Sequence, residues 1–471
     1  MAIQWSGLGP ELLLRLERGG DQPLRSQLET GIREAIRNGR LQAGERLPSS
    51  RELARELGVS RGLVQECYSQ LLSEGYLTSQ TGSATKVAMT AHVPAPNPSR
   101  VPVPAQRLIA DFRQGVPDLA SFPRGDWIWA TREACGRVAS ADLDYGDPRG
   151  SSVLRDVLAG YQRRVRAADA AGDRVIISTG FAQGVILVLR ALAQAGVRCV
   201  AFEDPGYGLA ETSEVVRAAS GHGMGVVHVP VDDLGIDVAA LDSSGAQVVV
   251  VTPAHQSPTG VVLAATRRHA LVDWARRNDA FIVEDDYDSE FRYDREPVGV
   301  LQGLAPDRVF TIGTASKALA PAVRLGWVLA PPLLADAVAA EKLISDRGSS
   351  TLDQLTLAAL LESGRYDRHL RRMRTVYAGR RARLIAALSQ HAPGIRLTGL
   401  AAGFHGVVDL PGSADEESVV ATALDRQVGL YGMGAFRAAA TAFPPQLVIG
   451  FGNVSERAIE PGISAIADLL S

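Results

Sequence analysis

The spacing of apolar residues divides the chain into a helical first part and a longer part in which strands and helices alternate. In the first part, apolar side chains recur at every fourth position from Leu24 to Ile36, which predicts a helix with one buried face. Pro23 suits the first position of this helix, where the missing N–H costs no hydrogen bond. We therefore expect a helix over residues 23 to about 40.

Two shorter helices and a hairpin follow in the pattern. Ser49 or Ser50 suits the cap of a helix over 51–57, and Ser60 suits the cap of another over 61–74. The segments 76–78 and 85–87 then flank Gly82, as the strands of a hairpin flank its turn. Helix, turn, helix and hairpin in this order predict a winged helix-turn-helix.

The longer part alternates short apolar runs with amphipathic stretches. Runs of three or four apolar residues followed by glycine or polar turns are typical of strands that are buried on both faces of a sheet. These runs lie at 175–177, 199–202, 248–251, 281–283 and 309–312. The pattern predicts an α/β domain, in which a ligand is expected at the carboxyl ends of the strands.

A proline-rich strip separates the two parts. Five of the eleven residues between Pro94 and Pro104 are proline, which excludes a helix or a central strand and favours a semi-rigid spacer. We therefore divide the chain into a DNA-binding-type domain at 1–87 with its core at 22–87, a linker at 88–109, and an α/β domain at 110–471.

Composition narrows the class of protein. A hydrophobic content of 46% and a charged content of 21% are typical of a globular protein, and 471 residues exceed one ordinary core. The chain has neither a membrane-length apolar run nor a signal-peptide pattern, so we expect a cytoplasmic protein without a membrane partner. A net charge of −3 means that any DNA contact must come from a local patch. The three cysteines form no metal-ligand pattern, so no metal is expected; they are Cys67, Cys135 and Cys199.

One lysine suggests covalent chemistry. Only three of the 49 basic residues are lysine, and Lys317 follows the hydroxyls of Thr314 and Ser316, with Arg324 seven residues beyond it. A primary amine forms a Schiff base with an aldehyde, whereas the flanking hydroxyls and the guanidinium suit a phosphate. This combination indicates a lysine that binds pyridoxal 5′-phosphate (PLP), although spacing alone does not separate it from a surface lysine.

Other reactive side chains follow the predicted strands in turn. A glycine turn at 178–184 suits a phosphate at a helix N-terminus, and Tyr207 places an aromatic ring near it. The acidic run at 284–288 contains Asp285 and Tyr287; a buried carboxylate would keep a pyridine nitrogen protonated, and a phenol would contact its neighbouring oxygen. Each feature has a simpler alternative, because acidic runs are usually solvated turns and a tyrosine usually packs. Their order at successive strand ends favours PLP.

The first part resembles the GntR family of bacterial DNA-binding domains over 22–87. The resemblance lies in GRL at 39–41, GERLPSSRELA at 44–54 and LGVSR at 57–61. It implies that Arg46 and Arg51 contact the DNA backbone and that Ser60, Arg61 and Gln65 begin the recognition helix in the major groove, roles that suit these side chains. A winged helix that binds protein instead remains the alternative.

The longer part resembles fold-type-I PLP enzymes of the aspartate aminotransferase family, which have a mixed, mostly parallel sheet. Together with the winged helix it resembles the MocR/GabR type of transcriptional regulator, above all in EDDYDSEFRY at 284–293. By this resemblance Lys317 forms the internal aldimine, Asp285 pairs with the pyridinium, Tyr287 bonds O3′ and Tyr207 stacks on the ring. The implied phosphate ligands are Thr314, Ser316, Arg324 and the backbone of Phe181 and Ala182, with Tyr145 reaching the phosphate of the other subunit of a homodimer.

Ser257 departs from the aminotransferase pattern, and Arg437 matches it poorly. Ser257 stands where aminotransferases usually have an asparagine that contacts O3′, and His255 nearby is a candidate to replace it or simply to satisfy the loop backbone. Arg437 lies where these proteins keep an arginine for a ligand carboxylate, and a structural arginine is the alternative.

These features predict a dimeric, PLP-dependent bacterial transcriptional regulator that binds double-stranded promoter DNA. Its expected effector is PLP, an amino compound that forms an aldimine with PLP, or both. The main rival is an aminotransferase with an accessory DNA-binding domain, so residual transaminase activity is compatible with the sequence. A sensor of PLP alone and an inert dimerisation scaffold are the further alternatives.

Overall fold

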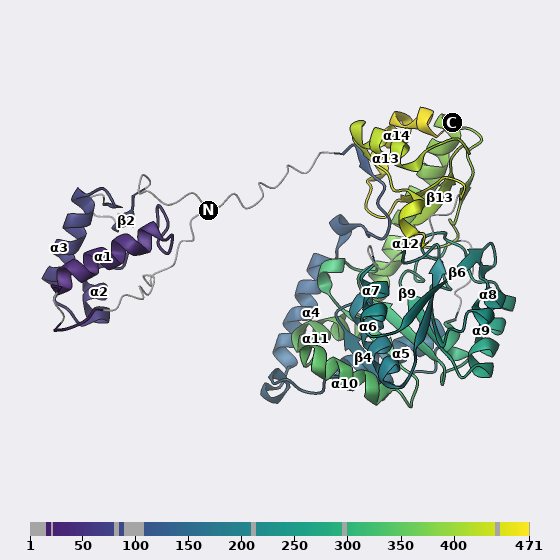
Figure 1. Ribbon diagram of the computed structural model, residues 1–471, viewed down its shortest axis with the longest axis horizontal. Coiled ribbons are helices and arrows are strands. Elements are labelled where there is room, and N and C mark those ends of the chain that lie inside the picture. Colours follow the sequence, from purple (N-terminus) through teal and green to yellow (C-terminus); the bar gives the residue numbers. More distant parts are fainter. Residues whose placement is uncertain are drawn as a thin grey trace. The chain divides into compact units, whose positions relative to one another are not determined.

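The computed structural model describes residues 16–19, 22–79, 84–88, 108–208, 213–293, 299–438 and 443–470. The chain forms two compact units, Met1–Ala105 and Gln106–Ser471, which are treated separately below (Figure 1). The predicted turn at Gly82 and the proline-rich strip lie outside the described residues.

The first unit contains the three predicted helices and a short antiparallel pair of strands. The elements are α1 (Leu24–Arg37), α2 (Ser50–Leu57), α3 (Arg61–Ser73), β1 (Leu77–Thr78) and β2 (Lys86–Val87). Ser49 and Glu52 form a reciprocal capping box at the start of α2, and Ser60 caps α3 through the Leu63 N–H. The winged helix-turn-helix is thus confirmed. Its core is built from the predicted apolar faces, with Leu28, Ile32, Ile36, Val64 and Leu71 fully buried.

The second unit is built around an eight-stranded mixed sheet. All strands run parallel except β11 and β7, which are antiparallel to their neighbours, so the predicted mixed, mostly parallel sheet is confirmed. In sheet order the strands are β4 (Val175–Ser178), β11 (Gly326–Leu329), β10 (Val309–Thr314), β9 (Phe281–Asp286), β8 (Val248–Val251), β5 (Cys199–Asp204), β6 (Gly225–Asp232) and β7 (Gly235–Ile236).

Helices bury both faces of this sheet. Along β8, Val248 and Val250 pack on one side and Val249 and Val251 on the other, as expected from the two-residue period of a strand. Helices α6 (Phe181–Gln194), α7 (Glu214–Gly221) and α10 (Ala335–Asp346) cover the first face, and α8 (Val238–Ser243) and α9 (Ala265–Arg277) cover the other (Figure 1). At the β4 and β11 end of the sheet this second face is covered by α5 (Ser152–Arg166); α11 (Thr351–Glu362) packs on α5, and α4 (Arg124–Arg137) packs on α11.

The C-terminal residues form a small lobe, which we define as residues 365–438 and 443–470; the rest of this unit from residue 113 is the large lobe. The small lobe has a three-stranded antiparallel sheet of β12 (Leu397–Thr398), β13 (His405–Asp409) and β15 (Gln446–Gly450). Its helices are α12 (Arg365–His391), α13 (Glu416–Asp425) and α14 (Glu456–Ala465), seen at the C-terminal end in Figure 1. Strand β14 (Val428–Gly429) pairs in parallel with β3 (Ala110–Asp111), which attaches the start of this unit to the small lobe.

Short 3₁₀ helices complete the described elements, at Leu119–Ser121, Ser140–Leu143, Gly172–Arg174, Leu301–Gly303, Pro321–Val323, Met433–Phe436 and Ala467–Leu469. Within the part of the chain that the structure describes, no helix combines the length and the apolar character needed to cross a membrane.

Candidate functional sites

The candidate cofactor residues lie at one edge of the central sheet. Strands β4, β5, β8, β9 and β10 are parallel, so their carboxyl ends meet at the same edge. Tyr207 follows β5, Asp285 is the penultimate residue of β9, and Lys317 follows β10. The topology therefore brings together residues that are far apart in the sequence.

Asp285 provides an unpaired acceptor in this region. Its side chain is buried, and its Oδ2 accepts a 2.7 Å hydrogen bond from the Tyr207 hydroxyl. Its Oδ1 has no hydrogen-bond partner among the described residues. Burial raises the pKa of Asp285 to about 8, although the Tyr207 hydroxyl and the charge of Lys317 act in the opposite direction. Asp285 is thus not part of a solvated turn, and its free oxygen suits a ligand that donates an N–H.

Lys317 points inward rather than to the surface. Its Nζ donates to the Gly115 carbonyl oxygen at 2.5 Å, and a Cβ on Gly115 would lie only 3.3 Å from this amine. Burial lowers the pKa of Lys317, whereas the charges of Asp285 and Asp288 oppose this change. Lower basicity favours the unprotonated amine that reacts with an aldehyde. The surface-lysine alternative does not describe this residue.

The N-terminus of α6 is suited to bind an anion of the size of phosphate. Phe181 and Ala182 are the first two residues of this helix, whose leading N–H groups lack intrahelical acceptors. Gly180 before them has φ +110°, a conformation that favours glycine, and its position lies within 4 Å of the Arg324 guanidinium. The structure thus places Arg324 beside the helix N-terminus, as the predicted phosphate site requires.

The two predicted hydroxyl ligands lie together after β10. The Thr314 hydroxyl donates to Ser316 Oγ at 3.0 Å, and the Ser316 N–H donates to Thr314 Oγ1 at 3.1 Å. Both hydroxyls therefore already face one another in the turn that carries Lys317. Tyr207 also belongs to this neighbourhood, because its ring stacks on that of Phe181 with centroids 5.5 Å apart and an interplanar angle of 9°.

Tyr287 contacts the loop after β8. Its hydroxyl donates to the His255 carbonyl oxygen at 2.9 Å and lies 3.3 Å from His255 Nδ1. Ser257 in the same loop is half-buried, and its N–H donates to Thr252 Oγ1. His255 also pairs with Asp288 at 2.8 Å. His255 was a candidate from the sequence, whereas its pairing with Asp288 was not expected.

Two further predicted residues, Tyr145 and Arg437, contact side chains outside the Lys317 and Asp285 neighbourhood. Tyr145 is 72% exposed, and its ring faces the Arg347 guanidinium at 5.4 Å. Arg437 stacks on Phe443 at 3.7 Å and donates to Gln446. Burial lowers the pKa of Arg437, opposed by Asp204 and Glu416. The next residue donates its N–H to Asp204 at the end of β5, which brings Arg437 near the same sheet edge.

The predicted DNA-contacting residues lie on the surface of the first unit. All five are exposed: Arg46, Arg51, Ser60, Arg61 and Gln65. Ser60 caps α3, so Arg61 and Gln65 lie in its first turns, where a recognition helix contacts bases. Within the described residues, no acidic side chain lies within ion-pair distance of Arg46, Arg51 or Arg61.

Two other arginines of this unit are neutralised by carboxylates. Arg25 pairs with Glu29 and Glu66, and Arg33 pairs with Glu29 and Glu74. Arg46, Arg51 and Arg61, at and next to α2 and at the start of α3, therefore keep their charge available for phosphates.

We expect Arg61→Ala to weaken binding to the protein's promoter DNA by about 1–3 kcal/mol and to relax base preference at one position of each half-site, because an arginine at the start of α3 reads base edges. Fluorescence anisotropy with promoter fragments measures the loss. Arg25→Ala is the control, since Arg25 is already paired with Glu29. Equal binding by Arg61→Ala and the wild-type protein would contradict this docking geometry.

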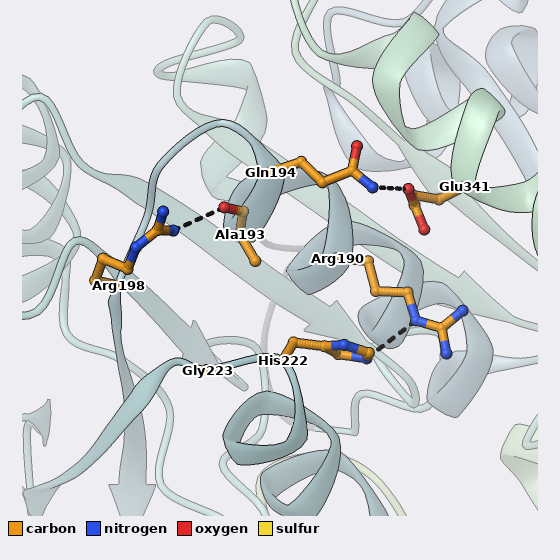
Figure 2. A pocket seen from close by; sticks show the side chains of 7 residues that line it. All are labelled: Arg190, Ala193, Gln194, Arg198, His222, Gly223 and Glu341. Carbon is orange, nitrogen blue, oxygen red and sulfur yellow. Dashed lines mark hydrogen bonds between the residues drawn. The ribbon is translucent and has the colours of Figure 1, made fainter.

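A separate polar hollow lies at the opposite end of α6. Its volume is about 450 Å³, and its lining consists of Arg190, Ala193, Gln194, Arg198, His222, Gly223 and Glu341. Figure 2 shows its polar groups bonded to one another, with Arg190 on His222, Gln194 on Glu341 and Arg198 on the Ala193 carbonyl. Because α6 begins at the candidate cofactor edge and ends here, this hollow is not part of the predicted site.

Comparison with known proteins agrees with this arrangement. Residues 24–87 match the model of the bacterial regulatory proteins of the gntR family, and residues 117–466 match that of aminotransferase class I and II. Among solved structures, the multiple substrate aminotransferase from Thermococcus profundus has a TM-score of 0.70 at 25% identity, covering 78% of this chain and 92% of that one. The fold and site therefore define a GntR-type helix-turn-helix joined to a class I and II aminotransferase domain.

Full-length relatives place the chain within a narrower family. The pyridoxine biosynthesis regulator PdxR of Corynebacterium glutamicum is 34% identical over 95% of this chain and 96% of its own length. The "probable rhizopine catabolism regulatory protein MocR" of Rhizobium meliloti is 35% identical over 80% of each chain. The chain belongs to the MocR-type family of HTH transcriptional regulators, as the resemblance in the sequence indicated.

Proposed function

We propose that this chain is a PLP-dependent transcriptional regulator that binds promoter DNA as a dimer and responds to PLP, or to an amino compound that reacts with bound PLP. The observation that carries the proposal is the buried, unpaired Asp285 Oδ1 at the sheet edge that also holds Lys317 and the α6 N-terminus. We assign DNA binding to residues 1–87, the linker to 88–109 and effector binding to 110–471. Promoter binding implies action in the bacterial cytoplasm.

The residues fit PLP group by group. When bound, PLP supplies an aldehyde that reacts with amines and a pyridine ring that acts as an electron sink. Lys317 would be the amine, Arg324 and the α6 N-terminus would bind the phosphate, and Tyr287 would offer its hydroxyl to the ring oxygen. Burial raises the pKa of Asp285 to about 8 in the absence of a ligand, and a protonated pyridine nitrogen beside its free oxygen would lower this pKa and pair with the carboxylate. The phosphate ligands would also include Thr314 and Ser316.

A dimer is supported by exposed apolar residues near Tyr145. Contiguous apolar surface of this kind usually marks an interface. The patch combines α4, the 140–145 segment, the end of α10 and the start of α11, and its exposed members are Ile128, Leu143, Tyr145, Leu343, Ile344 and Leu352. A second copy that covers this patch would bring its own Tyr145 to the cofactor region of the first. Paired winged helices would then read half-sites at whole helical-turn spacings.

Two effector classes follow from different observations. The name of PdxR ties one relative to pyridoxine biosynthesis, which favours PLP itself as the signal. Arg437, close to the end of β5, favours a ligand with a carboxylate, although its guanidinium already contacts Phe443 and Gln446. Spectral titration separates the two, because only an amino compound that reacts with the cofactor shifts its absorption. Multiple-turnover transamination without a footprint would favour the aminotransferase alternative.

We expect Asp285→Asn to weaken PLP binding by roughly 10- to 100-fold, because the amide cannot ionise and a hydrogen bond to a charged group contributes about 1.5–3 kcal/mol. Titration of the purified protein with PLP, followed by absorption, measures the affinity, and footprinting measures the DNA response. Asp233→Asn, an exposed acid in the β6–β7 turn, is the control. A colourless wild-type protein whose footprint ignores PLP would rule out the proposed function.

A further inference from the structure

Three buried polar side chains form a cluster across the boundary between the two lobes. His255 and Asp288 belong to the loops after β8 and β9 of the large lobe, whereas His405 is the first residue of β13 in the small lobe. Their exposed fractions are 0%, 1% and 2%. Buried polar groups at such depth are costly unless they are paired, so the pairing of each one is informative.

Both ring nitrogens of His255 face acceptors. Nδ1 lies 2.8 Å from Asp288 Oδ2, and Nε2 lies 3.0 Å from the Gly399 carbonyl oxygen in the small lobe. Burial alone would lower the pKa of His255, and Arg292 acts in the same direction, but the charge and hydrogen bond of Asp288 raise it overall. Two acceptors and a buried carboxylate therefore favour the imidazolium, which bridges the lobes with both of its N–H groups.

His405 complements this arrangement as a neutral ring. Its centroid lies 4.5 Å from that of His255, and its buried Nε2 has no partner among the described residues. Burial and the charges of His255 and Lys317 hold the pKa of His405 well below its usual range, whereas the Pro258 carbonyl opposes them. A proton on this pair of rings is therefore favoured on His255 rather than on His405.

The glycines of the 399–403 loop allow this close approach. Gly403 has φ +64°, and a Cβ there would collide with Asp288 Oδ2 and His255 Nδ1. Gly399 has φ +77° and lies against the backbone of Thr259. The Gly403 N–H donates to the Phe291 carbonyl oxygen at 2.7 Å. The loop is therefore fixed on the large lobe through the residues that surround His255.

Tyr287 connects this cluster to the candidate cofactor face. Its hydroxyl has one proton, which it donates to the His255 carbonyl oxygen, and it lies 3.3 Å from Nδ1 of the same residue. A ligand oxygen that accepts this proton must take it from His255. Occupation of the site would then change the environment of His255, and through Nε2 that of the Gly399 carbonyl.

We propose that His255 is a positioning residue that transmits the state of Tyr287 to the 399–403 loop of the small lobe, with Asp288 orienting its ring and His405 packing against it. The inference rests on the proposed function, because it assumes that PLP reaches Tyr287. It assigns to this chain a specific route by which effector binding alters the contact between the lobes.

A metal site is the competing explanation for the same three residues, whose ligand atoms lie within 4.8 Å of one another. A bound metal needs a bare nitrogen on each histidine. Nδ1 of His255 instead lies at hydrogen-bond distance from Asp288, and the raised pKa of His255 favours a proton there. The geometry therefore favours the hydrogen-bonded bridge over a metal site.

Hydrogen–deuterium exchange on the full-length protein, with and without PLP, tests the route. In the wild-type protein we expect PLP to change exchange at the Gly403 amide by about fivefold or more, the lower end of typical coupling between sites. His255→Asn retains a nitrogen near Nδ1 but loses the bond to Gly399, so the PLP-dependent change should disappear. His255→Gln retains a nitrogen near Nε2 and should preserve most of it. His222→Asn, an exposed histidine elsewhere, should respond like the wild-type protein.

The pH dependence of the absorption of bound PLP shows whether His255 transmits the effect of the cofactor or only stabilises the fold. Loss of the His255 cation should raise the pH midpoint of the absorption of bound PLP, because a nearby positive charge disfavours protonation. The same shift is expected in His255→Asn and His255→Gln. Removal of both charges in His255→Asn with Asp288→Asn should bring the midpoint back towards the wild-type value. An unchanged midpoint in all three variants would overturn the proposal.

The remaining outcomes are also decisive. If His255→Asn does not fold, His405→Phe replaces it, since it removes an unpaired polar atom and should fold while reducing the exchange response. An unchanged response in every folded His255 and His405 variant would refute the route. Stoichiometric metal in purified protein that is lost in His405→Phe would also overturn it. A wild-type protein that binds PLP without any change at 399–405 refutes this inference alone, whereas failure to bind PLP refutes the proposed function itself.

Discussion

Lys317→Ala is expected to abolish covalent retention of PLP and, with it, the effect of PLP on DNA binding. The side chain lies after β10 at the same sheet edge as Asp285, and its inward amine contacts Gly115. No other lysine can replace it, because Lys86 lies in the winged helix and Lys342 is bound by Asp346, Gln183 and Ser349. Borohydride reduction followed by mass spectrometry measures the loss directly.

Lys317→Arg serves as the matched control for this experiment. It keeps a positive charge near Asp285 but cannot form the Schiff base. We expect it to retain the fold and weak PLP binding without covalent attachment. If either variant preserved a PLP-dependent footprint of wild-type strength, covalent attachment would not be part of the regulatory switch.

Asp286→Ala is expected to lower the free energy of unfolding of the cofactor-free protein by about 3–5 kcal/mol. Asp286 accepts two hydrogen bonds from Arg166, at 2.8 Å from Nε and 2.6 Å from Nη2, and both side chains are buried. Removal of the carboxylate leaves a guanidinium in the interior without its main counter-charge. Urea unfolding followed by the fluorescence of Trp274 and Trp327, both buried in this unit, measures the change.

Two comparisons identify the cause of the destabilisation. Glu460→Ala removes the partner of Arg383 at the surface, so we expect a change below about 1 kcal/mol. Arg166→Met combined with Asp286→Leu removes both buried charges and should recover most of the stability that Asp286→Ala loses. Equal destabilisation by the single and the double replacement would show that the unpaired charge is not the cause of the loss.

Local sequence signals predicted the helices and strands whose structure is determined mainly by their own residues. The three helices of the first unit were predictable from their caps and four-residue spacing, and the capping box of Ser49 and Glu52 is present. The five predicted strands were recognisable because burial on both faces makes each of them a continuous apolar run. All five are confirmed as β4, β5, β8, β9 and β10.

The missed strands lack that signal. Strand β6 (GVVHVPVD) pairs only with β5 and the two-residue β7, and half-exposed residues interrupt its apolar pattern. Strand β11 is short and begins with Gly326, whose Cβ would collide with the backbone of Gly180 and Gly313. Its reversed direction is set by tertiary pairing between β10 and β4, which no local pattern encodes.

In the candidate cofactor site, too, residues that follow a local pattern were predictable, whereas contacts that depend on tertiary structure were not. The residues at strand ends were predictable in order, and the structure places Lys317, Asp285 and Tyr207 at one edge. The sequence missed Asp288 and His405 as partners of His255, because their contact depends on how the two lobes meet. Residues that come together only where the two lobes meet have no characteristic spacing in the sequence. The roles proposed for individual cofactor residues remain predictions until they are tested.

The short parallel pair of β3 and β14 decides where the linker is attached. Ile109, the last residue of the linker, donates its N–H to the Gln427 carbonyl oxygen, and Phe112 donates to that of Gly429, so the end of the linker is fastened to the small lobe. If the small lobe rotates, the end of the linker that leads to the DNA-binding unit moves with it, even if the large lobe stays still. A tilt of the small lobe at the sheet edge would therefore move the point at which the linker is attached.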